Sequence, residues 1–240
     1  MQYENEYDLS NQYDRGLQAV EAKSSFITRV YTKLALSILA LAGIEAAVFG
    51  IVGAEKILAF TESHLLAMGL VFLAMCVAGP FISNAVLASN PSRPTQYGLL
   101  AFNILIEATF LFPLLAVAGL YFGSALIWQA CGLTASLFIA LSAAVFVTRI
   151  DFSFLRSFLT FCGFAALILI AAALLFGFHL GMWFTIAVIF LACGYILYDT
   201  SVMMRYAEPD DDIICTINLF TSVMTLFFYI LRLLMELNRN

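Results

Sequence analysis

The segment IICTINLFTSVMTLFFYILRLLM, residues 213–235, decides how the rest of the chain is interpreted. Five polar residues follow one another through it at steps of four, three, four and three: Asn218, Ser222, Thr225, Tyr229 and Arg232. This spacing places all five on one face of an α-helix, whereas a strand would divide them between two faces. Every other residue from 213 to 234, apart from Thr216 and Thr221, is apolar or cysteine.

In a membrane the polar face of this helix has to meet other helices or water, because lipid offers no hydrogen-bond partners. We therefore expect the helix to be enclosed by the rest of a bundle, with Asn218, Ser222 and Thr225 facing inward. Hydrogen bonds between packed helices would explain the same pattern without any further function.

The composition is typical of helical membrane proteins. Of the 240 residues, 63% are hydrophobic and 11% are charged, and the mean hydropathy is +0.97. A net charge of −5 argues against nucleic-acid binding, since binding to phosphates needs a basic surface. The same balance predicts that acidic lipid headgroups are poor partners. Membrane lipid is the expected surrounding of the chain.

Seven runs are apolar and long enough to cross a hydrocarbon core of about 30 Å. They cover residues 34–53, 65–88, 98–121, 124–147, 157–178, 181–202 and 213–235. The chain is therefore predicted to be an all-α membrane protein with one seven-helix transmembrane domain, residues 34–240. Residues 1–33 are polar, and we expect a flexible tail up to about Ser24, followed by a short interfacial lead-in.

The basic residues are distributed unevenly between the two ends of these spans. With the N-terminus inside, eight of the 11 Lys and Arg residues fall on the cytoplasmic side. Four of these eight lie in or beside the connecting segments: Arg93, Arg149, Arg156 and Arg205. Because basic residues accumulate in cytoplasmic segments, we expect a cytoplasmic N-terminus and a C-terminus on the opposite side. A re-entrant last segment would reverse the side of the C-terminus.

The sequence contains none of the common catalytic motifs. HExxH, GxSxG, a Gly-rich phosphate loop and the GxGD pair of membrane proteases are all absent. The five cysteines lie in or at the edge of apolar spans without CxxC spacing, as packing residues do. We therefore expect a protein without enzymatic activity and without a cofactor. The sequence identifies no set of metal ligands.

Three acidic residues lie within the predicted spans: Glu45, Glu107 and Asp199. A charge buried in a membrane is costly unless it is paired, hydrated or neutralised. No Lys or Arg in the spans lies at the depth of these acids, so we expect them to hold a proton or a cation. Protonation would then act as a switch.

The depths of these acids predict where they meet the last helix. At about 1.5 Å per residue, Glu107 lies roughly 14 Å from the cytoplasmic end of its span, at a similar depth to Ser222. If the sixth span continues toward Tyr206, Asp199 reaches the level of Asn218. Glu45 is the weakest candidate, because a single acid in a first span can snorkel or hydrogen-bond to neighbouring backbone.

Several short motifs lie in these spans and in one connecting loop. They are GYILYDT at residues 194–200, DFSFL at 151–155, NLF at 218–220 with FYILRLL at 228–234, and, more weakly, IEAT at 106–109. Together they resemble the Bax inhibitor (transmembrane Bax inhibitor motif) family in its bacterial branch. The resemblance extends from about Phe26 to Leu234.

The resemblance implies six helices around a central last helix and a pH-sensitive calcium leak in a bacterial inner membrane. In characterised bacterial relatives, an aspartate of the sixth helix pairs with one of the seventh and forms a proton-sensitive latch. Asp199 matches the first aspartate, whereas Ser222 stands in the place of the second. The latch arginine of the family has no match, because residues 65–88 contain no basic residue.

Two functions from different classes follow. The first is a cation leak, with calcium as the transported ion rather than a cofactor. Its ion- and proton-sensing residues are Asp199, Glu107, Ser222 and Asn218, and its secondary polar network is Thr225, Tyr229, Arg232 and Glu45. The second is a regulator that binds a membrane protein, because some relatives restrain a membrane-anchored AAA protease and others suppress cell death through partners.

Overall fold

The protein is described by a computed structural model that covers residues 2–89 and 91–239. Within these residues the chain folds into helices joined by short connections. In chain order the helices are α1 (Gln2–Val52), α2 (Ala54–Ser63), α3 (Leu65–Ala88), α4 (Arg93–Val117), the π-helix η1 (Ala118–Phe122), α5 (Ser124–Thr148), α6 (Leu155–Phe176), α7 (Met182–Arg205) and α8 (Asp212–Asn238). The predicted all-α architecture is confirmed.

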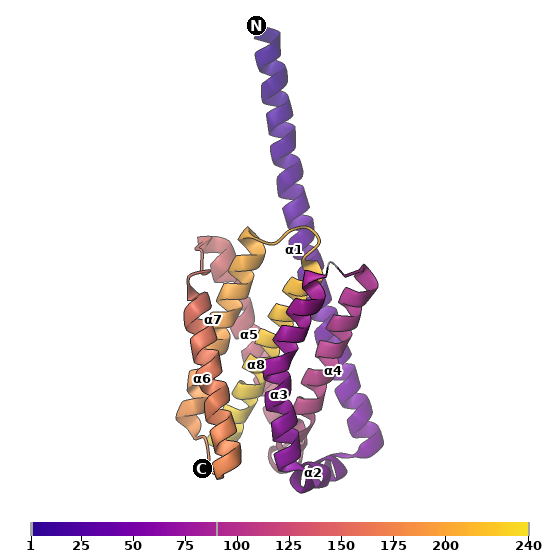
Figure 1. Ribbon diagram of the computed structural model, residues 1–240, viewed down its shortest axis with the longest axis vertical. Coiled ribbons are helices and arrows are strands. Elements are labelled where there is room, and N and C mark those ends of the chain that lie inside the picture. Colours follow the sequence, from indigo (N-terminus) through magenta and orange to yellow (C-terminus); the bar gives the residue numbers. More distant parts are fainter. Residues whose placement is uncertain (1, 90, 240) are drawn as a thin grey trace.

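Six helical segments of the described chain are long and apolar enough to cross a membrane. A seventh span is added if α2 and the first part of α3, which are bent by 86° at their junction, are counted together. Consecutive spans run in opposite directions because their connections are short (Figure 1). Only Gly123 joins η1 to α5, and its backbone φ of 83° is one that glycine adopts without strain.

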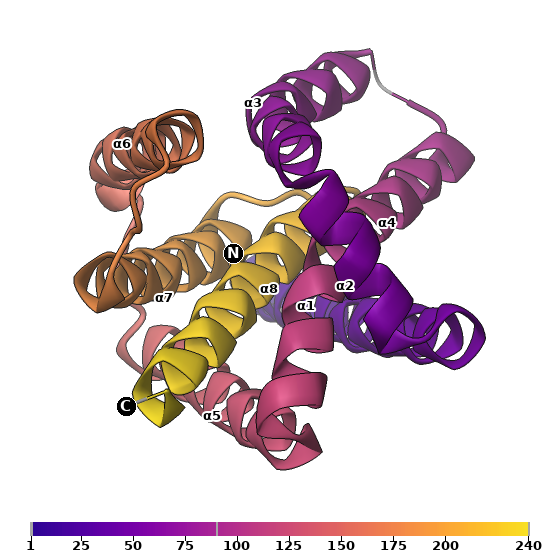
Figure 2. The same ribbon diagram turned by 90° about the horizontal axis from the view of Figure 1, so that it is seen from below.

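The last helix, α8, forms the core of the bundle. In its most apolar window 67% of the residues are buried, against 33% or less in every other span of the described chain. Figure 2 shows α8 in the middle of the bundle, where it packs against α1, α4, α5 and α7. The outer helices α3 and α6 pack against each other. Four of the spans thus pack on α8, the one that contains α4 also through η1, and a complete ring of six helices around α8 stays a prediction.

The N-terminal segment differs from the expected flexible tail. α1 is one continuous helix from Gln2, and its first half projects beyond the bundle (Figure 1). No proline interrupts residues 2–52, and good helix formers such as Glu, Gln, Ala and Leu are frequent among them. The helix is anchored where Phe26, Val30 and Leu34 are buried, so that it extends outward from an already formed turn.

The ten-residue helix α2, between the first two spans, was not predicted from the sequence. This helix lies across the end of the bundle opposite the N-terminus (Figure 2). Its sequence AEKILAFTES combines charged and apolar residues in a short stretch, which no membrane-span criterion detects. The first two spans are therefore joined by a helix instead of an irregular loop.

Candidate functional site

A hydrogen bond in the bundle joins two of the predicted site residues. Ser222 Oγ on α8 donates to Asp199 Oδ2 on α7 over 2.6 Å. These two helices pack on each other more extensively than any other pair in the described chain. Ser222 is buried and Asp199 is half-buried. α7 continues as far as Arg205, and Asp199 meets the polar face of α8 as predicted, but it does so at Ser222 and not at the expected level of Asn218 one turn away.

The Asp199 carboxyl has a hydrogen-bond donor but no countercharge. None of the ion pairs among the described residues includes Asp199. The hydroxyl of Ser222 is neutral, so it stabilises a carboxylate without cancelling its charge. An ionised carboxylate in such a place attracts a proton or a cation. No group of three or more His, Cys, Asp or Glu side chains suited to a metal ion occurs in the described part of the chain.

The remaining residues of the polar face do not all turn inward. Asn218 is exposed, which contradicts the prediction that it faces the interior, and Thr225 is half-buried. The helices that pack on α8 cover other parts of its surface and leave the side chain of Asn218 uncovered. Asn218 therefore lies one turn from the Asp199–Ser222 hydrogen bond without taking part in it.

Arg232 and Tyr229 belong to a separate set of contacts near the C-terminal end of α8. Arg232 Nε donates to Glu236 Oε1 over 3.1 Å, and its Nη2 donates to the Leu180 carbonyl over 2.6 Å. The buried Tyr229 ring packs edge to face on Phe184 of α7. About 15 Å of helix separates Arg232 from Ser222. These residues tie α7 to α8 and lie apart from the candidate switch.

Glu107 is also separate from the Asp199 site. It is half-buried on α4, within electrostatic range of Cys76 on α3. No hydrogen bond or ion pair joins its side chain to another described residue. Glu107 and Ser222 were predicted to lie at a similar depth, but no hydrogen bond joins them.

Glu45 is more unusual than its sequence position indicated. Its side chain is buried, and neither carboxyl oxygen has a hydrogen-bond partner among the described residues. The two alternatives considered for this acid, snorkelling to the surface or a hydrogen bond to neighbouring backbone, are therefore not found in the structure. A buried carboxyl without any partner is costly in its charged form, so Glu45 belongs with the candidate proton carriers.

A group of buried hydroxyls lies beside the candidate switch. The Tyr31 hydroxyl on α1 faces those of Ser142 on α5 and Thr200 on α7, and Thr200 directly follows Asp199. None of the three has a hydrogen-bond partner at bonding geometry in the described chain. Buried polar groups of this kind normally bind water. The three residues lie far apart in the sequence, so no spacing pattern indicates this group.

A charged cluster closes the end of the bundle that carries the N-terminal extension. The carboxylate of Asp212, whose side chain is 3% exposed, accepts hydrogen bonds from Lys33 on α1 and from Arg93 Nη1 on α4, the latter at 2.6 Å. Arg29 Nε lies 3.7 Å from the same carboxylate, and Arg93 also pairs with the exposed Asp210. One carboxylate at the start of α8 thus holds α1 and α4 together.

The motif loop between α5 and α6 is fastened to the end of α7. Tyr206 Oη donates to Asp151 Oδ2 over 2.6 Å, and the Ser153 backbone N–H donates to Asp151 Oδ1 over 2.9 Å. Chiefly through the Tyr206 hydrogen bond, these contacts lower the pKa of Asp151 to about 2. This contribution to stability is present above the ordinary pKa of 3.8 and is lost as the pH falls through about 2. Asp151 is therefore ionised throughout the neutral range.

Comparisons of the sequence show which known proteins this chain is similar to. The family model for inhibitor of apoptosis-promoting Bax1 matches residues 23–240. An uncharacterised membrane protein of Vibrio cholerae is 36% identical over 125 residues, which are 49% of this chain and 53% of that protein. Bax inhibitor 1 of Schizosaccharomyces pombe is 33% identical over 172 residues, 67% of this chain and 61% of the yeast protein. The matched region thus spans about half to two thirds of these two relatives.

A further relative matches along most of its length. Protein lifeguard 4 of Mus musculus is 26% identical over 232 residues, which are 92% of this chain and 89% of the mouse protein. The residues matched by the family model, 23–240, include Asp199 and Ser222 and the residues of the Asp212 cluster. The chain is an integral membrane protein of the Bax inhibitor family.

Proposed function

We propose that this protein is a pH-sensitive leak for cations, calcium among them, with Asp199 as its proton switch. The observation that carries the proposal is the Ser222–Asp199 hydrogen bond between α7 and α8. It leaves one half-buried carboxyl between α7 and α8 with a donor and no countercharge among the described residues.

The switch follows from the two protonation states of this carboxyl. When Asp199 is ionised, Ser222 donates to it, and its negative charge attracts a cation. When Asp199 is protonated, this attraction is lost and the hydroxyl of Ser222 can accept from the acid instead. With one carboxyl at the switch, the flux follows the binding of a single proton and falls as the pH falls.

Flux measurements on the purified protein test this function. Calcium entry into liposomes that contain the protein is compared with entry into protein-free liposomes at pH 7, with chloride entry as a control for membrane damage. We expect calcium entry above the protein-free level without a matching rise in chloride entry. Equal rates in the two kinds of liposome would contradict the proposal.

The charged loop that holds Asp151 provides a control for the pH response. We expect Asp151→Asn to leave the pH midpoint of calcium flux unchanged between pH 5 and 8, because a carboxyl with a pKa of about 2 is ionised throughout this range. The measurement is the flux profile of this variant beside that of the parent. A displaced midpoint would make this loop part of the sensor.

The orientation and the location of the protein are part of the same proposal. Arg93 contacts the start of α8 beside Arg29 and Lys33, and Arg205 donates to the backbone carbonyl of Arg149. The basic residues counted as cytoplasmic thus gather at one end of the bundle. Their position supports a cytoplasmic N-terminus in a bacterial inner membrane, and six helices around α8 complete the proposed architecture.

The projecting part of α1 favours a second function, regulation of a membrane-protein partner. Residues 2–22 lie outside the family match and extend α1 beyond the bundle (Figure 1). Deleting these residues distinguishes the two functions. We expect the leak to keep its calcium flux after the deletion, since the truncated chain retains every residue of the Asp199 site. A regulator that uses this helix would lose its partner while the bundle stays folded.

A further inference from the structure

A cavity of about 630 Å³ opens between α1, α5 and α7 at the end of the bundle that carries the N-terminal extension. Its volume is in the range of about 300–1,000 Å³ that is usual for small-molecule sites. Of the 11 described residues that line it, three are basic, Lys23, Arg149 and Arg205, and none is acidic. The hydroxyl groups of Ser24, Thr28 and Ser201 complete the polar part of the wall.

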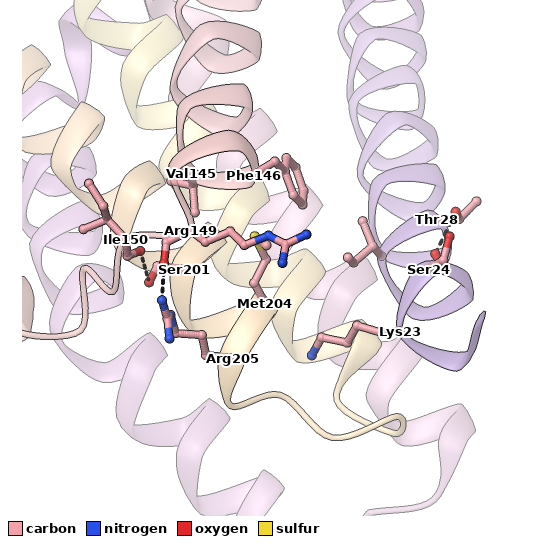
Figure 3. A pocket seen from close by; sticks show the side chains of 11 residues that line it. Lys23, Ser24, Thr28, Val145, Phe146, Arg149, Ile150, Ser201, Met204 and Arg205 are labelled. Atoms are coloured by element: carbon pink, nitrogen blue, oxygen red, sulfur yellow. Dashed lines mark hydrogen bonds between the residues drawn. The ribbon is translucent and has the colours of Figure 1, made fainter. Parts of the chain in front are cut away.

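Two of the basic side chains approach the same space from opposite walls. Figure 3 shows Arg149 reaching from the end of α5 toward α1, and Lys23 reaching from α1 toward α5. The left-handed backbone of Arg149, with φ of 52°, ends α5 and directs the chain away from the helix at this point. Two cations directed at one space repel each other unless an anion lies between them.

Among the described residues, few partners occupy the hydrogen-bond donors of these side chains. Lys23 Nζ donates to the Met203 carbonyl over 3.1 Å, and Arg205 donates to the Arg149 carbonyl. The Arg149 guanidinium forms no hydrogen bond or ion pair with any residue that the structure describes. Asp151, an acid within electrostatic range of Arg205, accepts a hydrogen bond from Tyr206 and is not among the described residues that line the cavity. The cavity is therefore suited to an anion, and it repels metal cations.

The rest of the wall and its surroundings point to the membrane as the source of this anion. Val145, Phe146 and Met204 form an apolar wall beside the basic groups. On the outer surface at the same end, Val147 is 82% exposed and Phe154 is 74% exposed, as side chains in contact with lipid are. Arg149 follows directly on α5, which is one of the spans, so the basic groups lie at the level of lipid headgroups.

We propose that this cavity binds an anionic phospholipid, with the phosphate between Lys23 and Arg149 and the start of an acyl chain along Val145 and Phe146. Arginine and lysine at the end of membrane helices are suited to this ligand, because they bind phosphate oxygens through charge-assisted hydrogen bonds. The net charge of −5 disfavours acidic surfaces for the protein as a whole, but the cavity concentrates three cations in one place. A lipid bound here connects α1 with α5 and α7 and stabilises their packing.

The test uses the purified full-length chain in a neutral detergent. Its melting temperature is measured with added phosphatidylglycerol, with phosphatidylcholine and with inorganic phosphate, each over the same concentrations. We expect only phosphatidylglycerol to raise the melting temperature in a saturable way. An equal rise with phosphatidylcholine would overturn the proposal, and an equal rise with inorganic phosphate would show a free-anion site instead of a lipid site.

Variants locate the binding site. The double variant Lys23→Gln/Arg149→Gln is expected to weaken the apparent affinity for phosphatidylglycerol at least about tenfold, since it removes two charge-assisted contacts. Arg156→Gln is the matched control, because it removes an exposed basic residue on α6 that does not line the cavity. Equal losses in the control and in the double variant would contradict the site.

A second measurement keeps the proposal testable if the double variant does not fold. Native mass spectrometry of the unmodified protein in an equimolar mixture of phosphatidylglycerol and phosphatidylcholine is expected to show one retained phosphatidylglycerol. Arg149→Lys, which keeps the charge, is expected to retain this preference. No preference for the anionic lipid in the unmodified protein would overturn the proposal.

Discussion

Ser222→Asp is expected to move the pH midpoint of calcium flux upward by about one unit or more, because it places a second carboxyl within hydrogen-bond distance of Asp199. In the parent, Ser222 Oγ lies 2.6 Å from Asp199 Oδ2. Two carboxyls at such a distance share a proton, since their like charges oppose ionisation of both. The variant therefore holds its proton at a pH where the parent has lost it. Flux into liposomes between pH 5 and 8 measures the shift.

Two controls separate this effect from a change in packing. Ser222→Asn introduces a side chain of similar size without a titratable group, so we expect no upward shift of this kind. Adding Asp199→Asn to Ser222→Asp removes the proposed sensor and is expected to abolish the pH response. An unchanged midpoint in Ser222→Asp would mean that the ionisation of Asp199 does not control the flux.

Asp212→Ala is expected to destabilise the folded protein by about 2–3 kcal/mol, because it removes the buried anion on which three cations converge. Breaking a fully buried ion pair costs about 3–5 kcal/mol. The loss predicted for Asp212→Ala is smaller because solvent screens the side chains of Arg29 and Arg93, which are each 45% exposed. In a chain of this size we expect the melting temperature in detergent to fall by about 5–10 °C.

Asp210→Ala is the matched control for this prediction. Asp210 pairs with the same Arg93 at 2.5 Å, but its side chain is 88% exposed, and we expect a loss of about 0–1 kcal/mol. If the two variants melted at the same temperature, the Asp212 cluster would be no more than a surface ion pair. The predicted difference therefore depends on the burial of Asp212 and not on its charge alone.

The pairing of Asp199 with Ser222 was implied by the family resemblance, which puts Ser222 in the place of the second latch aspartate, whereas two local rules brought Asp199 only to the level of Asn218 on the polar face. Helical spacing groups Ser222 with its polar neighbours, and the rise per residue compares depths along antiparallel helices joined by the short segment 206–211. The same rules were insufficient for Asn218, which is exposed. The helical repeat in the sequence shows which residues share a face of the helix. The packing of the other helices decides whether that face is covered.

The charged cluster and the buried Glu45 show a different limit. Asp212 is 179 residues from Lys33 and 119 residues from Arg93, so no local pattern connects them. Glu45 ranked as the weakest candidate because such an acid can snorkel or bond to backbone, yet its carboxyl is buried without a partner among the described residues. Both outcomes depend on how distant helices pack, which a single sequence does not state.

The prediction of a flexible N-terminal tail was wrong because it rested on the polar composition of the segment alone. It did not take account of the buried residues that follow the segment. Polar residues before Ser24 are typical of a tail, but the buried Phe26, Val30 and Leu34 fix the helix from which these residues continue. The basic cavity has a similar origin. Lys23, Arg149 and Arg205 are unremarkable in the sequence, and they form a site because the C-terminal ends of α5 and α7 meet the middle of α1.

Calcium flux through the Asp199→Asn variant in liposomes, measured from pH 5 to 8 beside the parent, tests the proposed switch most directly. Asparagine keeps the shape of the side chain and its contact with Ser222 but cannot be ionised. We predict that flux through the parent falls as the pH falls, along a one-proton curve, whereas the variant conducts less at pH 8 and shows no pH response. If the variant keeps the parent's pH profile, Asp199 is not the sensor, and the role passes to Glu107 or Glu45.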